Sequence, residues 1–170
     1  DHSWMAPGHL LIVAIPDLKQ HNRPDKLTPK VDLDTLTQMR ELAQAHAAPG
    51  ITVHARNPDY QAIRLDFGMR FLPGHPFDYT RQQLHAAIVQ ALSPWAFSTD
   101  RPLDFGGRIY RSVLLNLIEE LPYVNYVTHF RCGLAGKGLL LMNDVAEVAA
   151  TRPNVILVSA AQHVITEATD

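Results

Sequence analysis

Residues 92–130 read LSPWAFSTDRPLDFGGRIYRSVLLNLIEELPYVNYVTHF, and this stretch decides the predicted fold. Ser93-Pro94 is expected to end a helix, because proline lacks a backbone N–H and pushes the preceding residue out of the helical region. Trp95 and Phe97 follow in a loop that is too apolar to be a plain solvated connector. We therefore expect this loop to lie over the protein's own core or against another chain.

The second half of the stretch predicts a helix and a strand. From Gly106-Gly107 onward, apolar residues recur at helical spacing, which predicts a helix over residues 106–121. Pro122 is expected to end that helix. Residues 123–130 alternate with a period of two and predict a strand with one or both faces covered.

One long strand and two further helices are predicted before this stretch. Residues 63–71 alternate strictly between apolar and polar side chains, which predicts a strand with one packed face and one wet face. Apolar residues at helical spacing predict a helix over residues 33–47, with Asp32 or Asp34 as its N-cap, and another over residues 79–92. The order strand, helix, helix, strand predicts one compact unit of sheet and helices.

The remaining segments are shorter. Residues 19–30 are polar and contain two prolines, which predicts an exposed loop or, as the alternative, an arm on a neighbouring chain. Residues 144–150 predict a helical turn or a linker. Short strands are expected at residues 9–15, 51–54, 139–142, 155–158 and around 162–165.

Together these elements predict an α+β fold. We expect about five to seven short strands in a mixed, mainly antiparallel sheet, with about three packed helices. Residues 1–56 are expected to form a smaller strand-helix-strand unit that carries the long polar loop, and residues 57–170 the main α+β domain. A chain of 170 residues is long enough for one domain or two small ones.

The composition excludes several classes of partner. Hydrophobic residues make up 46% and charged residues 19%, which is typical of a globular protein with some surface covered by partners. The net charge is −2 and no basic run occurs, so nucleic acid is not expected as a partner. Cys132 is the single cysteine, which excludes an intrachain disulfide. No apolar run approaches the ~20 residues of a membrane span.

No catalytic or metal-binding motif stands out in the sequence. The nine histidines lack the local spacing that zinc sites use, so we expect no metal and no cofactor. Residues 133–138 contain GxxGKG, which lacks the spacing of a phosphate loop and predicts a turn. Ser112 and Ser159 lack a nucleophile elbow, and Cys132 lacks a nucleophile signature. The sequence therefore predicts a protein that is not an enzyme. The alternative is a small hydrolase or metal-dependent enzyme whose site is assembled from sequence-distant residues.

Several linked phrases carry a family resemblance. In order, they are VHARNPDYQAIRLDFGMRFLPGHPF, LSPWAF, DFGGRIYRS, IEELPYVNYVTHF and ILVSAAQHVI. This series resembles the C-terminal part of baseplate J-like wedge proteins of contractile injection systems, which are phage tail-like and type VI secretion-like particles. The first thirty residues and residues 98–103 match least. Because those wedge proteins are much larger, we expect the chain to be a fragment of a longer polypeptide.

The resemblance implies a structural and mechanical role. It implies a wedge component that connects neighbouring wedges around the spike or hub and helps transmit the trigger for sheath contraction. The implied partners are other wedge subunits, spike or hub proteins and sheath-proximal proteins, in a hetero-oligomer within a symmetric ring. The implied location is the baseplate of a particle assembled in the bacterial cytoplasm, without nucleic-acid binding or a membrane span.

Aromatic side chains are the candidate functional residues. Large aromatic residues dominate interface hot spots and also fill protein cores, so both roles are open for this set. The candidates are Trp95, Phe97, Phe105, Tyr110, Tyr123 and Tyr126.

Overall fold

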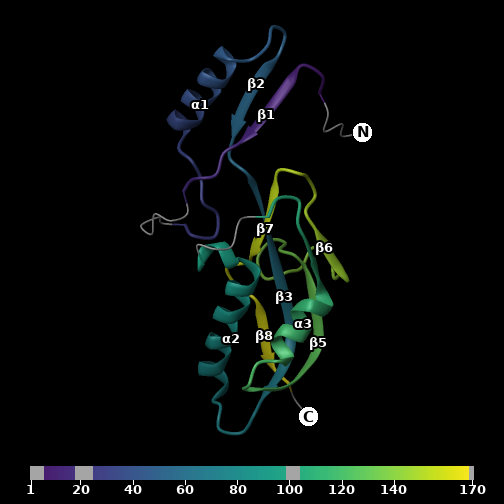
Figure 1. The fold of residues 1–170 in the computed structure, drawn as a ribbon. Helices are drawn as coiled ribbons and strands as arrows, with labels where there is room; N and C mark the ends of the chain where they lie inside the picture. Colours follow the sequence, from purple (N-terminus) through teal and green to yellow (C-terminus); the bar gives the residue numbers. More distant parts are fainter. Residues whose placement is uncertain (1–5, 18–24, 99–103, 169–170) are drawn as a thin grey trace. The chain divides into compact units, whose positions relative to one another are not determined.

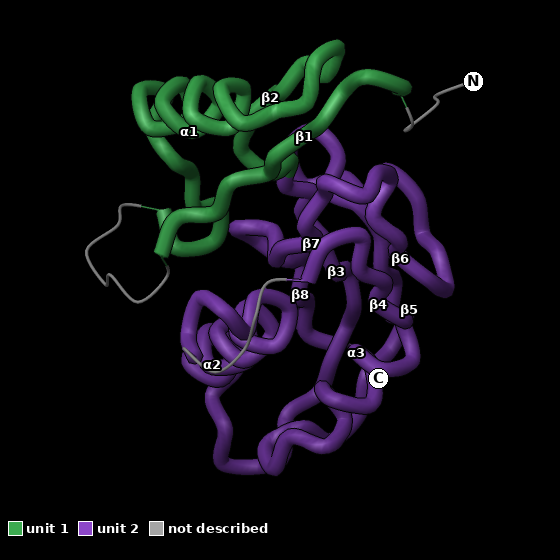
Figure 2. Tube along the Cα trace, turned by 45° about the horizontal axis from the view of Figure 1, so that its top comes forward, with its two compact units in different colours: residues 1–59 green, residues 60–170 purple. Residues whose placement is uncertain are grey.

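The structure is a computed structural model, and it describes residues 6–17, 25–98 and 104–168. Residues 99–103 of the predicted loop at 98–103 and residues 19–24 of the predicted loop at 19–30 lie outside the described residues. The chain divides into two compact units, Asp1–Asp59 and Tyr60–Asp170 (Figure 2).

The first unit is a strand-helix-strand element (Figure 1). Its strands β1 and β2 pair in parallel, and the helix α1 connects them. Asp32 caps α1 as predicted, because its carboxylate accepts a hydrogen bond from the Thr35 N–H at 2.8 Å. The bounds are β1 His9–Val13, α1 Leu33–Ala45 and β2 Thr52–Arg56.

Burial in this unit differs from the expectation. The apolar run of β1 predicts a buried strand, yet Leu10 and Leu11 are 49% and 45% exposed. On α1, Leu36 is the buried residue, whereas Leu33 and Leu42 are exposed. Two strands and one helix offer too little cover to bury every apolar side chain of the unit.

The second unit is organised around the long strand β3. β3 lies between β5 and β7 in the sheet, and β8 also pairs with it. Figure 1 shows β3 running along the unit with β5 and β8 beside it. A short antiparallel pair, β4 with β6, forms a separate sheet. The bounds are β3 Asp59–Phe71, α2 Phe77–Leu92, the 3-10 helix η1 Pro94–Ala96, β4 Arg108–Tyr110, α3 Arg111–Glu119, β5 Val124–Leu134, β6 Glu147–Ala149, β7 Val155–Ser159 and β8 Val164–Glu167.

The core of this unit lies where both of its helices meet the sheet. Leu65 and Phe67 of β3 are fully buried or nearly so, as are Leu84 of α2 and Ile118 of α3. All four belong to one continuous apolar cluster. The α+β class predicted from the sequence is therefore confirmed.

The second face of β3 is less wet than its alternation predicts. Arg64 is 7% exposed, and its guanidinium donates to the Gly138 carbonyl. Asp66 pairs with Arg131 of β5, directly opposite it in the antiparallel register. Opposite charges at facing positions stabilise the ladder, so this face is covered by polar contacts instead of open water.

Three predicted elements were wrong. The helix predicted over 106–121 begins only at Arg111, because residues 108–110 form β4 and pair with β6. The helical turn or linker predicted over 144–150 contains β6 itself. The strand predicted over 139–142 is a loop held by a single bridge between Ala135 and Leu141. Instead of one sheet, the described residues hold three.

Gly133 tests how closely this loop packs against β5. A Cβ at Gly133 would lie 1.6 Å from the Asn143 carbonyl oxygen, which is backbone and has no rotamer to change. We therefore expect Gly133→Ala to lower the free energy of unfolding by about 3 kcal/mol or more, measured by urea denaturation.

Gly68 provides the matched control. There the added Cβ would meet the Thr128 side-chain oxygen at 2.6 Å, and that side chain can rotate. Gly68→Ala should cost clearly less than Gly133→Ala, and equal losses would contradict the close backbone approach at Gly133.

Candidate functional site

A buried polar network joins β3, β7 and the start of β8. His163 is 9% exposed and lies directly before β8. Its Nδ1 is 3.2 Å from the Leu65 backbone nitrogen, and its Nε2 is 3.1 Å from Ser159 Oγ. The Ser159 N–H in turn donates to Ser93 Oγ at 3.0 Å. The contact between a serine and a histidine makes this network the first candidate for an active site.

The hydrogen bonds assign the tautomer of His163. Because the Leu65 N–H donates to Nδ1, that nitrogen carries the lone pair and Nε2 carries the proton. Nε2–H therefore donates to Ser159 Oγ, and the Ser159 hydroxyl donates to the Ala160 carbonyl. A base that activates serine needs its lone pair on the nitrogen facing the hydroxyl. The pair in this state is a structural link and not an activated nucleophile.

Burial also keeps His163 neutral. The pKa of His163 is lowered to about 3, mainly by desolvation and in smaller part by electrostatic interaction with His85 and Arg64. The rings of His85 and His163 lie 5.2 Å apart between their centroids. A neutral ring is what the hydrogen-bond pattern requires, so the electrostatics and the geometry agree.

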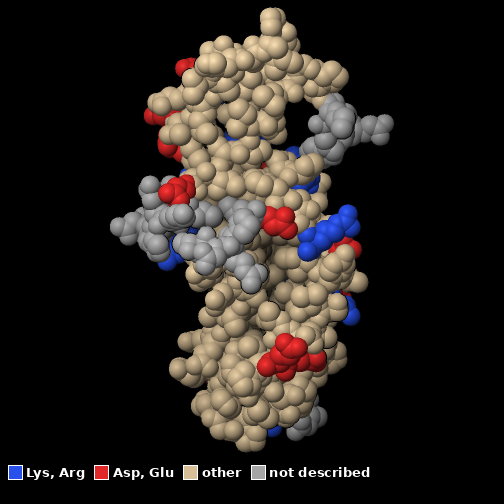
Figure 3. Space-filling view, in the orientation of Figure 1, with Lys and Arg blue, Asp and Glu red and all other residues tan. Residues whose placement is uncertain are grey.

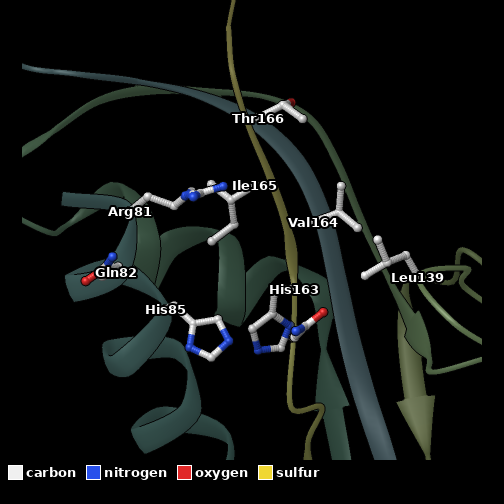
Figure 4. A pocket seen from close by; sticks show the side chains of 9 residues that line it. Arg81, Gln82, His85, Leu139, His163, Val164, Ile165 and Thr166 are labelled. Atoms are coloured by element: carbon white, nitrogen blue, oxygen red, sulfur yellow. The ribbon is translucent and has the colours of Figure 1, made fainter. Parts of the chain in front are cut away.

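A groove of about 520 Å³ runs beside β8 (Figure 4). Figure 4 shows Arg81 and His85 of α2 on one side of β8 and Leu139 on the other. The residues that line it are Arg81, Gln82, His85, Leu139, Gln162, His163, Val164, Ile165 and Thr166. They come from three separate regions of the sequence, so no local motif marks the groove.

A second groove of about 760 Å³ carries charges of both signs. It includes the ion pair of Asp66 with Arg131, and Arg111 lies 3.6 Å from Asp144. Among the described residues, no group of three or more histidine, cysteine, aspartate or glutamate side chains could hold a metal ion. Because its charges are already paired, this groove is suited to polar contact and not to holding a phosphate.

Cys132 is unsuited to nucleophilic chemistry. The pKa of the Cys132 thiol is raised to about 11, mainly by burial and in smaller part by the nearby Asp144 carboxylate. The thiolate is the reactive form of cysteine, so a thiol with this pKa is inert near neutral pH.

The six candidate aromatic residues do not form one cluster. Trp95 is 7% exposed and lies in η1, whereas Phe97 is 55% exposed. Phe105 and Tyr110 are also exposed, at 39% and 49%. Each of these three exposed rings is available for contact with another chain, whereas the Trp95 ring is buried.

The other two tyrosines lie near or on β5. Tyr123 is half-buried, and its ring lies 6.1 Å from that of Phe71 between centroids. Tyr126 of β5 is 36% exposed. The sequence missed a more exposed apolar set, Leu139, Leu140 and Met142, because their run of apolar residues predicted a strand.

The charged surface shows no patch of one sign on the face in view. Figure 3 shows acidic and basic side chains in small separated groups among uncharged residues. No helix among the described residues is both long and apolar enough to cross a membrane.

Comparison with solved structures shows where this fold occurs. The chain is similar to a chain in a structure described as the cryo-EM structure of the anti-feeding prophage (AFP) baseplate, 6-fold symmetrised. The TM-score is 0.60 at 18% sequence identity, and the match covers 89% of this chain and 29% of that chain. At this identity the likeness shows a shared α+β fold, over less than a third of the larger chain.

The family follows from the sequence. Residues 4–160 match the family described as "Baseplate protein PVC11-like", so the chain belongs to that family. No curated protein matches the chain. The expectation of a baseplate protein is thereby confirmed.

Trp95 and Phe97 should contribute very differently to stability. Trp95→Ala removes a buried ring and should lower the free energy of unfolding by about 3–5 kcal/mol. Phe97→Ala removes an exposed ring two residues away and should change it by less than about 0.5 kcal/mol. Denaturant unfolding of both variants measures this difference. An unchanged stability in the Trp95 variant would show that the ring is not part of the core.

His163 should make stability depend on pH. Its pKa in the folded chain, about 3, lies below its ordinary value of 6.5, so the unfolded chain binds the proton first as the pH falls. The stabilisation is therefore complete above pH 6.5 and is lost between pH 6.5 and about 3, at up to ~1.4 kcal/mol per pH unit.

The variant His163→Asn tests this dependence. The asparagine oxygen can still accept the Leu65 N–H, but the side chain does not titrate. Urea unfolding between pH 4 and 7 should show a shallower slope for this variant than for the wild type. His129→Asn is the control, because His129 is exposed and its φ of 51° suits asparagine. Equal slopes for the wild type and His163→Asn would contradict the assignment.

Proposed function

We propose that this chain is part of a J-like baseplate wedge subunit of a contractile injection particle. In this role it connects neighbouring wedges around the spike or hub and helps transmit the trigger for sheath contraction. Membership of the PVC11-like baseplate family over residues 4–160 is the observation that carries the proposal. The order and spacing of the J-like phrases support the wedge role.

Exposed apolar side chains in the first unit support a role in assembly. Leu33 is 78% exposed and Leu42 67% exposed on α1, and Leu10 and Leu11 are exposed on β1. A unit of this size, Asp1–Asp59, buries a smaller share of its surface than a larger domain and is marginally stable by itself. Apolar surface of this kind is characteristic of interaction sites, so we expect another baseplate subunit to cover it.

The site chemistry supports a structural role over catalysis. The Nε2 proton of His163 faces Ser159, so the histidine cannot take the serine proton in this state. The buried Cys132 thiol keeps its proton at neutral pH because its pKa is raised to about 11. The serine–histidine pair and the cysteine are therefore both held in unreactive forms.

The partners and the location follow from the same proposal. The partners are other wedge subunits, spike or hub proteins and sheath-proximal proteins, arranged in a symmetric ring. Assembly takes place in the bacterial cytoplasm. The net charge of −2 is compatible with protein contacts and gives no attraction to nucleic acid.

Light scattering of the full-length parent protein tests the proposal. Mixed with the proteins encoded beside it, the parent should form a hetero-oligomer of defined mass. Leu42→Glu should weaken that oligomer by tenfold or more, because it places a charge on exposed apolar surface of α1.

Glu41→Ala is the matched control, since Glu41 is an exposed polar neighbour on the same helix. It should leave the mass of the oligomer unchanged. A parent protein that stays monomeric with every neighbour would overturn the wedge proposal.

A further inference from the structure

The strand β8 is paired on one side only among the described residues. It runs parallel to β3, with Val164 beside Asp66 and Glu167 beside Met69. No strand pairs with its other edge in the described part of the unit. An unpaired strand edge is a template for hydrogen bonding with another chain.

The register shows which backbone groups point outward. The Ala168 N–H donates to the Met69 carbonyl at 2.9 Å, so Ala168 faces β3. In a parallel pair, alternate residues direct both backbone groups toward the same neighbour. Val164 and Thr166 therefore face β3 with Ala168, whereas the N–H and C=O groups of Ile165 and Glu167 point away from the sheet. This edge offers two donors and two acceptors at strand spacing.

The groove beside β8 gives this edge two walls (Figure 4). On one side, Leu139 lines the groove with an apolar side chain that is 57% exposed. On the other side stands α2. The volume of about 520 Å³ lies within the range of about 300–1,000 Å³ that is usual for ligand grooves.

The charges in the groove favour an acidic occupant. Arg81 and His85 line its α2 wall, and no aspartate or glutamate is among the lining residues. Arg81 lies 3.4 Å from Asp78, but the Asp78 side chain is 87% exposed, and such a pair contributes little and can exchange partners. An acidic side chain entering the groove would gain the arginine as a partner.

We propose that the edge of β8 binds an extended segment of another baseplate subunit by strand addition. The segment adds a strand beside Ile165 and Glu167. It places an apolar side chain against Leu139 and an acidic side chain toward Arg81 and His85. This inference rests on the proposed function, because that function supplies the neighbouring subunit.

Hydrogen exchange of the full-length parent protein tests the strand. The probe is the parent protein alone and the same protein in the hetero-oligomer formed with its encoded neighbours. Amides in residues 162–168 should exchange at least tenfold more slowly in the oligomer. Unchanged exchange in this segment, in an oligomer that contains the parent protein, would overturn strand addition and leave the wedge role standing.

Two variants of Glu167 separate backbone pairing from simple cover. Both Glu167→Pro and Glu167→Ala remove the carboxylate that lies 3.9 Å from Arg70, but only proline removes the outward N–H. Proline is tolerated on a strand edge whose N–H faces solvent. Glu167→Pro should weaken assembly tenfold or more, whereas Glu167→Ala should weaken it less than threefold. Equal effects would overturn the backbone contact.

A surface variant tests the groove even if the proline variant does not fold. Leu139→Glu changes a groove side chain that is 57% exposed, so the thermal unfolding midpoint should stay the same while assembly weakens. Leu33→Glu in the first unit is the control. In the oligomers that this variant still forms, amides in residues 162–168 should exchange as slowly as in the wild-type oligomer. If the wild-type parent forms no oligomer at all, both the wedge role and strand addition fail. If it forms one that Leu139→Glu does not weaken, strand addition alone fails.

Discussion

The second unit depends on β3, which is paired along both edges and covered on both faces. A central strand of this kind must satisfy every backbone group through its neighbours and every side chain through the layers above and below. Arg64 is the hardest side chain to satisfy, because it is a charge that is 7% exposed. Its guanidinium donates to the Gly138 carbonyl, and this bond fixes the loop that carries Leu139. The requirement to pair one buried charge therefore positions an exposed wall of the β8 groove.

The neutral side chain of His163 links β3 to β7 by hydrogen bonds. His163 accepts from the Leu65 N–H of β3 and donates to Ser159 at the end of β7. His163 directly precedes β8, so these two hydrogen bonds fix the start of that strand to the core. A strand edge that is already held in place loses little conformational entropy when a partner pairs with it, and pre-organisation of this kind favours binding.

The sequence predicted the elements whose signals are local. The alternation of residues 63–71 marked β3, and helical spacing over residues 79–92 marked α2 to within two residues of its start. It failed where pairing is non-local. Residues 108–110 read as helix from their apolar spacing, yet they form β4 because β6, almost forty residues later, supplies the partner. The exposure of β1 was equally hidden, since an apolar run has the same composition whether its cover lies in the same chain or in another.

The candidate site likewise depends on arrangements that local sequence signals do not reveal. Aromatic composition pointed to Trp95 and Phe97, but only the fold shows that the first is buried and the second exposed. The β8 groove joins Arg81 to Thr166, residues that share no motif. For an assembly protein this is expected, because contact with another subunit needs open backbone edges and uncovered apolar walls instead of a fixed set of reactive groups. The functional information of such a chain therefore lies in the backbone and apolar groups that its own fold leaves uncovered, which only the three-dimensional arrangement identifies.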